Sequence, residues 1–123
     1  MFNNAGLIGH LGADPESRTF PSGSQVSRFT LYVNERFNND GEVQERTHRF
    51  PVEVWGKSAG FVKDYLHKGS KVAVEGALAE DTWTDGEQQK HSRVVIKARR
   101  IENLTPKAAD QDETAAYDDE PEF

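Results

Sequence analysis

Three aromatic residues stand among polar or charged residues, where their rings can face solvent: Trp55, Trp83 and Phe37. Cations accompany two of these rings along the chain: Arg36, Arg49 and Lys57. A ring can stack on an unpaired base for about 1–3 kcal/mol, while Lys and Arg side chains follow the phosphates. Aromatic rings are also enriched where protein subunits meet. The residues alone therefore indicate either a surface for single-stranded nucleic acid or a protein contact, and favour neither.

Alternating apolar residues predict the strands that would carry these rings. In residues 46–55, Phe50, Val52 and Val54 share one face, and Trp55 lies on the other. If the first three fill the core, Trp55 faces outward. Residues 26–33 alternate in the same way. Between these strands, residues 37–41 indicate a hairpin tip with an Asp-Gly turn, which places Phe37 in the tip.

The remaining elements follow from glycines, caps and further alternation. Glycines break the apolar run of residues 6–12, a pattern typical of a strand that bends or that another backbone approaches closely. Residues 58–66 predict a helix, with Ser58 as N-cap and Gly69 as the left-handed C-terminal cap. Residues 71–83 and 91–104 predict two long strands joined by a hairpin at 84–87. Trp83 then ends a strand, just before a polar turn.

The order is three strands, one helix and two more strands. We predict an all-β domain: a five-stranded OB-fold barrel with one short α-helix between strands 3 and 4. A small β-sandwich with an incidental helix fits the same order. We place this domain at residues 1–105 and a flexible acidic tail at residues 106–123.

Charge is segregated along the chain. The last sixteen residues hold seven acids and neither Lys nor Arg. Such a segment cannot build a core, so we expect it to be a disordered, solvated tail. The whole chain carries a net charge of -6, but residues 1–107 hold 15 basic and 14 acidic residues, a net charge of +1. The overall acidity therefore does not argue against a nucleic-acid partner.

The chain lacks the residues that several functional classes require. The chain has no cysteine, which excludes disulfides and thiolate metal sites. We expect no enzyme, metal or cofactor, because no Walker-type or dinucleotide-type glycine loop and no Ser-His-acid grouping occurs. The four histidines are scattered without ligand spacing: His10, His48, His67 and His91. No apolar run reaches the roughly 20 residues of a membrane span. The first residues also lack the pattern of a secretory signal, so we expect a cytoplasmic protein.

A series of short motifs runs in order along nearly the whole chain. They are the run 6–15 (GLIGHLGADP), Pro21-Ser22-Gly23, Asn34-Glu35-Arg36, Val54-Trp55-Gly56-Lys57, the run 65–72 (YLHKGSKV), Val74-Glu75-Gly76, Trp83 and the acidic end 118–123 (DDEPEF). Each motif is weak alone, but the order and spacing are highly specific. By these motifs the chain resembles bacterial-type single-stranded DNA-binding proteins of cellular, phage or plasmid origin.

The resemblance implies an OB-fold protein, usually a homotetramer, that coats single-stranded DNA during replication, recombination and repair. It implies no enzyme activity, no cofactor and a cytoplasmic, nucleoid-associated location. Trp55 and Trp83 fall on base-stacking positions of that family, and Phe37 falls where another stacking ring is common. Arg18, Lys57 and Lys68 fall on positions where the family uses cations against phosphate. The family's acidic tip, here Asp118, Asp119, Glu120, Pro121, Glu122 and Phe123, would bind replication and repair proteins.

Three features depart from the family's pattern. Arg49 stands where well-known enteric members have a stacking tryptophan, so guanidinium contact would replace stacking there. The run 79–82 (AEDT) is acidic where many relatives are basic, and the tip reads Pro-Glu-Phe rather than Pro-Phe.

An OB-fold adaptor that buries its outward rings against protein partners is the alternative function.

Overall fold

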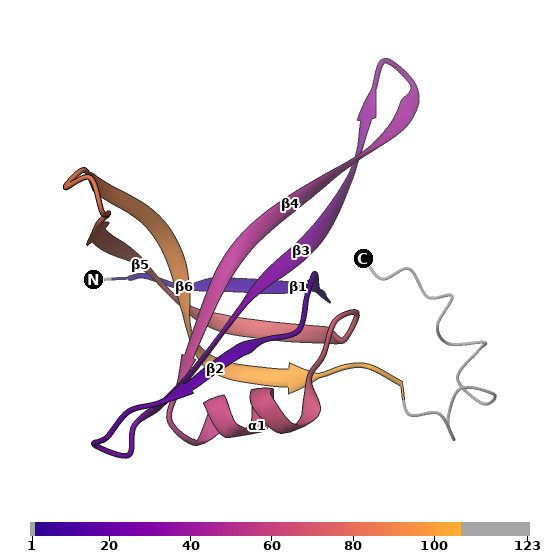
Figure 1. Cartoon of the computed structure of the whole chain (residues 1–123). Coiled ribbons are helices and arrows are strands. Elements are labelled where there is room, and N and C mark those ends of the chain that lie inside the picture. The colour runs from indigo at the N-terminus through magenta and orange to yellow at the C-terminus, as the bar shows by residue number, and fades with distance from the viewer. Residues whose placement is uncertain (1, 107–123) are drawn as a thin grey trace.

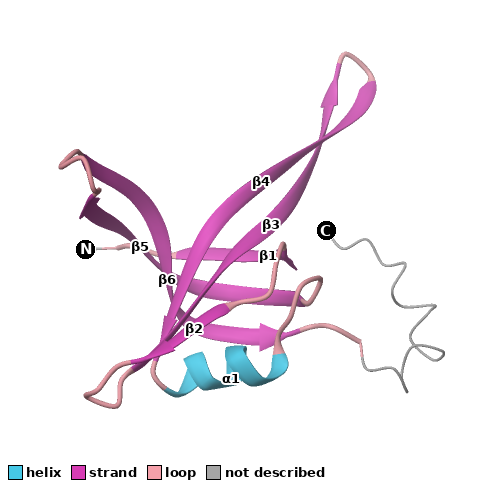
Figure 2. Ribbon diagram, in the orientation of Figure 1, coloured by secondary structure: helices cyan, strands magenta, loops and turns pink. Residues whose placement is uncertain are grey.

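Six strands and one helix make up residues 2–106, the part of the chain that the computed structural model describes (Figure 1, Figure 2). In chain order they are β1 (Ala5–Leu11), β2 (Glu16–Thr19), β3 (Gln25–Asn39), β4 (Glu42–Trp55), α1 (Lys57–Tyr65), β5 (Lys71–Thr84) and β6 (Lys90–Asn103). Within these residues no helix is both long and apolar enough to cross a membrane. The acidic tail predicted for residues 106–123 lies outside the described residues, apart from Pro106, and so does its tip.

Five of the strands close into a barrel. β5 pairs with β1 on one side and with β6 on the other, both antiparallel, and β6 runs parallel to β4 at Val52 and Glu53. β4 pairs along its whole length with β3, which returns to β1 at His10 and Leu11. The short strand β2 adds to β3. The predicted five-stranded barrel with a helix after its third strand is confirmed, and the sandwich alternative is wrong because the ladder closes.

The core lies where the apolar faces of the strands meet the buried side of α1. Phe29 and Leu31 of β3 and Val52 and Val54 of β4 are buried together, as their alternation predicted. Val62 of α1 is fully buried in the same cluster. The opposite face of β4 is thereby turned away from the core.

Close backbone approach explains why β1 contains glycine. A Cβ on Gly9 would collide with the backbone carbonyl of Tyr32 on β3, and one on Gly12, just after β1, would collide with the side-chain ring of Tyr32. The predicted close approach of another backbone to this strand is therefore confirmed. This contact allows β3 to reach β1 and complete the barrel.

The helix begins and ends differently from the prediction. Gly56 is the N-cap, with φ of 78°, and no side chain caps the helix. Ser58 lies inside the first turn, so its prediction as N-cap is wrong. The positive φ lets the chain turn from Trp55 into α1 within one residue, which only glycine adopts readily. The helix ends with Leu66 in an extended conformation, and Gly69, although its φ is 90°, lies in the following turn.

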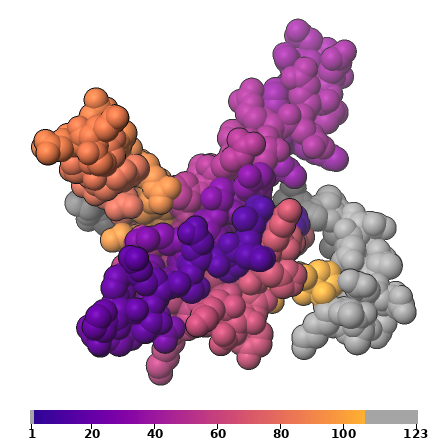
Figure 3. All heavy atoms as spheres, in the orientation of Figure 1, coloured from indigo at the N-terminus to yellow at the C-terminus, as the bar shows by residue number. Residues whose placement is uncertain are grey.

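Two hairpins extend beyond the barrel (Figure 1, Figure 3). β3 and β4 form an arm that turns at Asp40 and Gly41, whose positive φ values of 55° and 87° suit the predicted Asp-Gly turn. The strands continue almost to this turn, so Phe37 lies within the ladder opposite Gln44, and its predicted place in a loop tip is wrong. β5 and β6 form the second hairpin, and the space-filling view shows a hollow between the two projections (Figure 3).

Candidate nucleic-acid interface

Trp55 lies at the end of β4 with 45% of its surface exposed, on the face turned away from the core. Its indole Nε1 donates a hydrogen bond of 2.9 Å to Glu53 Oε1. Its ring stacks on Phe20, with centroids 5.8 Å apart and planes 12° from parallel. The indole is thus fixed at its edge and covered on one side, while much of it is open to a planar ligand.

Glu53 is a buried carboxylate beneath this surface, only 7% exposed. It accepts hydrogen bonds from the Trp55 indole and from Arg28 Nε, the latter at 3.0 Å. Burial opposes the charge of Glu53, but the hydrogen bonds from Trp55 and Arg28, with the nearby charges of Arg28 and Lys97, outweigh it. The pKa of Glu53 therefore lies below its usual value. An ionised Glu53 keeps Trp55 and Arg28 in place.

Phe20 connects Arg18 to Trp55. The Arg18 guanidinium lies 5.7 Å from the centroid of the Phe20 ring, which itself stacks on Trp55. The structure thereby brings Arg18, predicted as a phosphate contact, next to the Trp55 site. Sequence reasoning missed Phe20, because it precedes a Pro-Ser-Gly turn and carries no alternation signal.

Arg49 and Tyr32 form a second pair on the same side of the β3–β4 ladder as Trp55. They are opposite residues, and the Arg49 guanidinium lies 5.2 Å from the Tyr32 ring centroid. Both side chains are exposed. A cation over a ring offers a phosphate contact and a planar surface together. Tyr32 was missed, since its partner lies seventeen positions away in the chain.

The two predicted residues of the arm lie on opposite faces of the ladder. Arg36 shares the Trp55 side and forms an exposed ion pair of 3.3 Å with Glu45. Phe37 is on the other side, half-buried, with the Arg46 guanidinium 4.9 Å from its ring centroid. The structure therefore does not bring Phe37 together with Trp55 on one face.

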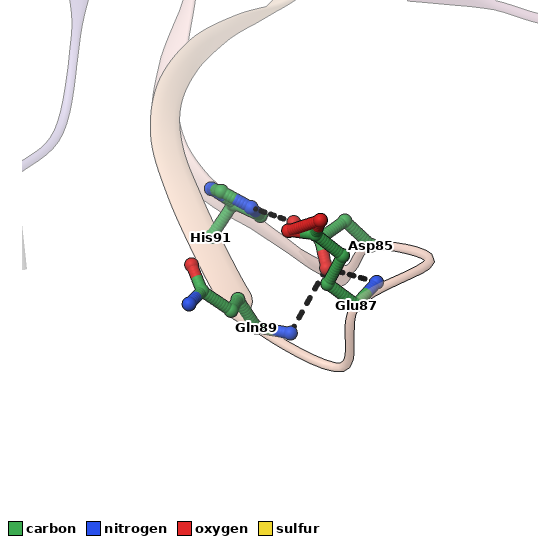
Figure 4. Close-up of polar contacts among 4 residues, drawn as sticks. All are labelled: Asp85, Glu87, Gln89 and His91. Carbon is green, nitrogen blue, oxygen red and sulfur yellow. Dashed lines mark hydrogen bonds and ion pairs between the residues drawn. The ribbon is translucent and has the colours of Figure 1, made fainter.

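Trp83 lies next to the end of β5 and is also 45% exposed. Its ring stacks on His91 of β6, with centroids 5.4 Å apart, and the Arg93 guanidinium lies 5.8 Å from its centroid. A hollow of about 420 Å³ borders Trp83 and His91. His91 in turn contacts Asp85 of the turn, whose pKa is lowered by that hydrogen bond and by backbone N–H groups (Figure 4).

Cations of β6 join the two tryptophan sites into one surface. In the β5–β6 ladder, Arg93 and Lys97 lie on the same side as Trp83. Lys97 is also the register partner of Glu53 on β4, next to Trp55. We call this side the outward face: Trp83, Arg93, Lys97, Arg28, Arg49 and Trp55. Arg93 lies opposite Asp81, so β6 supplies positive charge beside the acidic run of β5.

The predicted lysines lie near opposite ends of α1. Lys57 is its first residue, exposed and two positions after Trp55. Lys68 follows the helix, with its backbone N–H bonded to Asp14. A nine-residue helix spans roughly 13 Å at 1.5 Å per residue. Lys57 therefore joins the Trp55 site, whereas Lys68 lies apart from it. Among residues 2–106 no group of three His, Asp or Glu side chains could hold a metal ion.

A closed barrel that presents rings and cations on one outward face, with a buried acid supporting them, has the architecture of a binding protein. Residues 2–104 match the Single-strand binding protein family, so the chain belongs to that family. This confirms the resemblance seen in the sequence motifs. The family is one of binding proteins rather than enzymes.

Three relatives show how far the similarity extends. The single-stranded DNA-binding protein of Wolinella succinogenes is 33% identical over all of this chain and 80% of its own length. That of Aquifex aeolicus is 39% identical over 89% of this chain and 76% of its own length. Single-stranded DNA-binding protein 1 of Chlorobaculum tepidum is 45% identical over 68% of this chain, and the match spans about half, 52%, of that relative.

Proposed function

We propose that this protein binds single-stranded DNA without regard to sequence. The observation that carries the proposal is the outward face, where two indoles, each 45% exposed, lie on either side of Lys97, with Arg93 beside Trp83 and Arg28 near Trp55. The names of the relatives, which are single-stranded DNA-binding proteins, support the same ligand. The strand would pass from Trp83 on the β5–β6 hairpin over Lys97 to Trp55, and onward to Arg49 and Tyr32.

Base stacking and phosphate contacts would both contribute to the binding of single-stranded DNA. Every base has a flat face, so stacking on Trp55 and Trp83 does not depend on sequence. Phosphate contacts position the strand and also carry no sequence information. Residues 1–107 have a net charge of only +1, so the long-range attraction of DNA to this part of the chain is modest. The affinity for DNA therefore depends mainly on stacking on the rings and on several binding sites that engage one strand together.

Tryptophan fluorescence tests the proposal directly, because Trp55 and Trp83 are the two tryptophans of the chain. Titration with oligo-dT should quench their emission, and the affinity should fall with salt by about 0.7 log units per log unit of salt for each phosphate contact. A poly-adenine strand should bind with a similar salt slope. Emission that stays unchanged on saturating addition of oligo-dT contradicts stacking and favours a protein adaptor instead.

Assembly into a homotetramer is the second part of the proposal. One edge of β1 pairs with β5, and the other pairs with β3 only at His10 and Leu11, so this second edge has no strand partner from Ala5 to Ile8 among residues 2–106. An open strand edge is a template for pairing with a second copy. A concavity of about 840 Å³ borders this edge, and exposed Ile8 lines it. Sedimentation velocity of the full chain should give four copies, and a monomer at micromolar concentration overturns this part.

The tail forms the third part of the proposal. We infer roles in replication, recombination and repair, in which the acidic tip from Asp118 to Phe123 recruits other proteins. The negative charge of the tail would also compete with DNA for the cations of the outward face. Deleting residues 108–123 should therefore raise the affinity for oligo-dT at low salt, and an affinity that falls on deletion contradicts the competition. The cytoplasmic, nucleoid-associated location and the domain boundary at residue 105 remain predictions.

A further inference from the structure

The turn between β5 and β6 holds a histidine against an exposed tryptophan. His91 and Trp83 are opposite residues of the ladder, and their ring planes are 20° from parallel. His91 Nε2 lies 2.7 Å from Asp85 Oδ2. The other carboxylate oxygen, Oδ1, accepts the backbone N–H groups of Glu87 and Gln89 at 2.8 and 2.9 Å (Figure 4). The turn backbone therefore fixes Asp85, and Asp85 fixes the imidazole on the indole.

The two ring nitrogens of His91 differ in their hydrogen bonds. An ionised carboxylate only accepts hydrogen bonds, so Nε2 carries the proton that it donates to Asp85. Nδ1 is then the nitrogen at which a second proton makes the imidazole positively charged. Among residues 2–106, no hydrogen bond to His91 Nδ1 is formed. A protonated Nδ1 is thus available as a donor to a ligand that approaches Trp83.

The charges around His91 come from the two strands and the turn. Arg93 of β6 lies over the same indole and is opposite Asp81 of β5. Lys90 of β6 precedes His91, and Glu87 is exposed in the turn. The hydrogen bond from His91 lowers the pKa of Asp85, so this carboxylate stays ionised wherever histidine titrates. Protonation of His91 therefore adds one positive charge to a hairpin whose other charges do not change.

We propose that His91 is a further contact to single-stranded DNA, whose protonated ring binds a phosphate beside the base stacked on Trp83. Asp85 is the positioning residue that holds the imidazole on the indole, and the base stacks on the part of the indole that stays exposed. The inference rests on the proposed function and makes affinity depend on pH. Binding tightens as the pH falls through the range in which histidine ordinarily changes charge, about pH 8 to about pH 5.

Binding of the full chain to labelled oligo-dT, at fixed salt and at about pH 5.5 and about pH 8.5, tests the inference. The variant His91→Phe keeps a ring against Trp83 but cannot be protonated. Asp85→Asn keeps an oxygen for the turn backbone but loses the acceptor for Nε2. His67→Phe is the matched control, because His67 is exposed but stacks on no aromatic ring among residues 2–106. Circular dichroism at both pH values confirms that each variant is folded.

We expect the unaltered protein and His67→Phe to bind about three- to tenfold more tightly at the lower pH, the effect of one net hydrogen bond at a solvent-exposed site. His91→Phe should bind like the unaltered protein at the higher pH and lose this gain, and Asp85→Asn should lose most of it. A His91→Phe protein that keeps the full pH dependence overturns the inference and leaves the proposed function standing. An unaltered protein that binds oligo-dT at neither pH overturns both.

Discussion

The two tryptophans of the outward face have the same exposure but different supports. Trp55 is held at the barrel by a buried carboxylate, Glu53, and by the Phe20 ring. Trp83 is held at a projecting hairpin by His91, which an exposed turn positions. The first support belongs to the folded core and the second lies in solvent. We therefore expect changes at Trp55 to affect both stability and binding, and changes at Trp83 to affect binding alone.

Replacing each tryptophan separately gives the largest effect and the most direct test of this difference. Trp55→Ala and Trp83→Ala should each weaken oligo-dT binding by about 1–3 kcal/mol, the usual contribution of a stacked base. Trp55→Ala should also lower the free energy of unfolding by about 2 kcal/mol, since it removes a hydrogen-bond donor from the buried Glu53 carboxylate and the stacking partner of Phe20. Trp83→Ala should stay within about 0.5 kcal/mol of the unaltered protein. Urea unfolding gives the stabilities, and equal destabilisation by the two variants contradicts the comparison.

Replacing Glu53, which supports Trp55, should mainly lower the stability of the fold. Glu53→Met leaves the indole Nε1 and Arg28 without their acceptor and should cost about 1–3 kcal/mol of stability. Glu53→Gln keeps an acceptor oxygen and should cost less. The matched control is Glu45→Met, which breaks an exposed ion pair with Arg36 and should cost at most about 1 kcal/mol. If Glu53→Met and Glu45→Met unfold at the same urea concentration, Glu53 gives no special support.

The onward path of the DNA strand from Trp55 can be tested through a cation that lies on it. Arg49→Ala removes an exposed guanidinium from the Trp55 side of the ladder and should reduce the salt slope of oligo-dT binding by about 0.7, the share of one phosphate contact. Lys63→Ala removes another exposed cation, from α1, and should leave the slope unchanged. The slopes come from titrations at several salt concentrations. If Lys63→Ala changes the salt slope more than Arg49→Ala does, the DNA strand follows the helix side of the barrel instead.

What the sequence could predict depended on local periodicity. The barrel strands alternate because one face of each meets the core, and that alternation placed Trp55 outward. β2 was not predicted, because its four residues are all exposed and carry no apolar alternation. The arm of β3 and β4 leaves the barrel and has polar residues on both faces, so its sequence looked like a loop and Phe37 was placed in a tip.

Local sequence patterns could not predict which residues support the exposed rings. Phe20 and Trp55, and Tyr32 and Arg49, meet only because the register of the sheet brings distant positions together. His91 was noted only as one of four scattered histidines, since stacking on Trp83 requires a hairpin whose strands begin and end at the right residues. Ser58 was chosen as a helix cap by its type, although the positive φ of Gly56 had already started the turn.

Acid sensitivity gives the smallest expected effect and separates the two supports by pH. The pKa of Glu53 is lowered in the folded protein relative to its usual value of 4.5. The ionised carboxylate therefore stabilises the fold above this value, and the contribution is lost as the pH falls through the lower folded pKa. Thermal unfolding of the unaltered protein and of Glu53→Gln should differ most above the usual pKa of a glutamate and converge as the pH falls through the lower folded pKa. His91→Phe removes the hydrogen bond that lowers the pKa of Asp85, but this pair is exposed, so its effect over this range should be smaller than that of Glu53→Gln. A constant difference for Glu53→Gln would mean that the charge of Glu53 plays no part in holding Trp55.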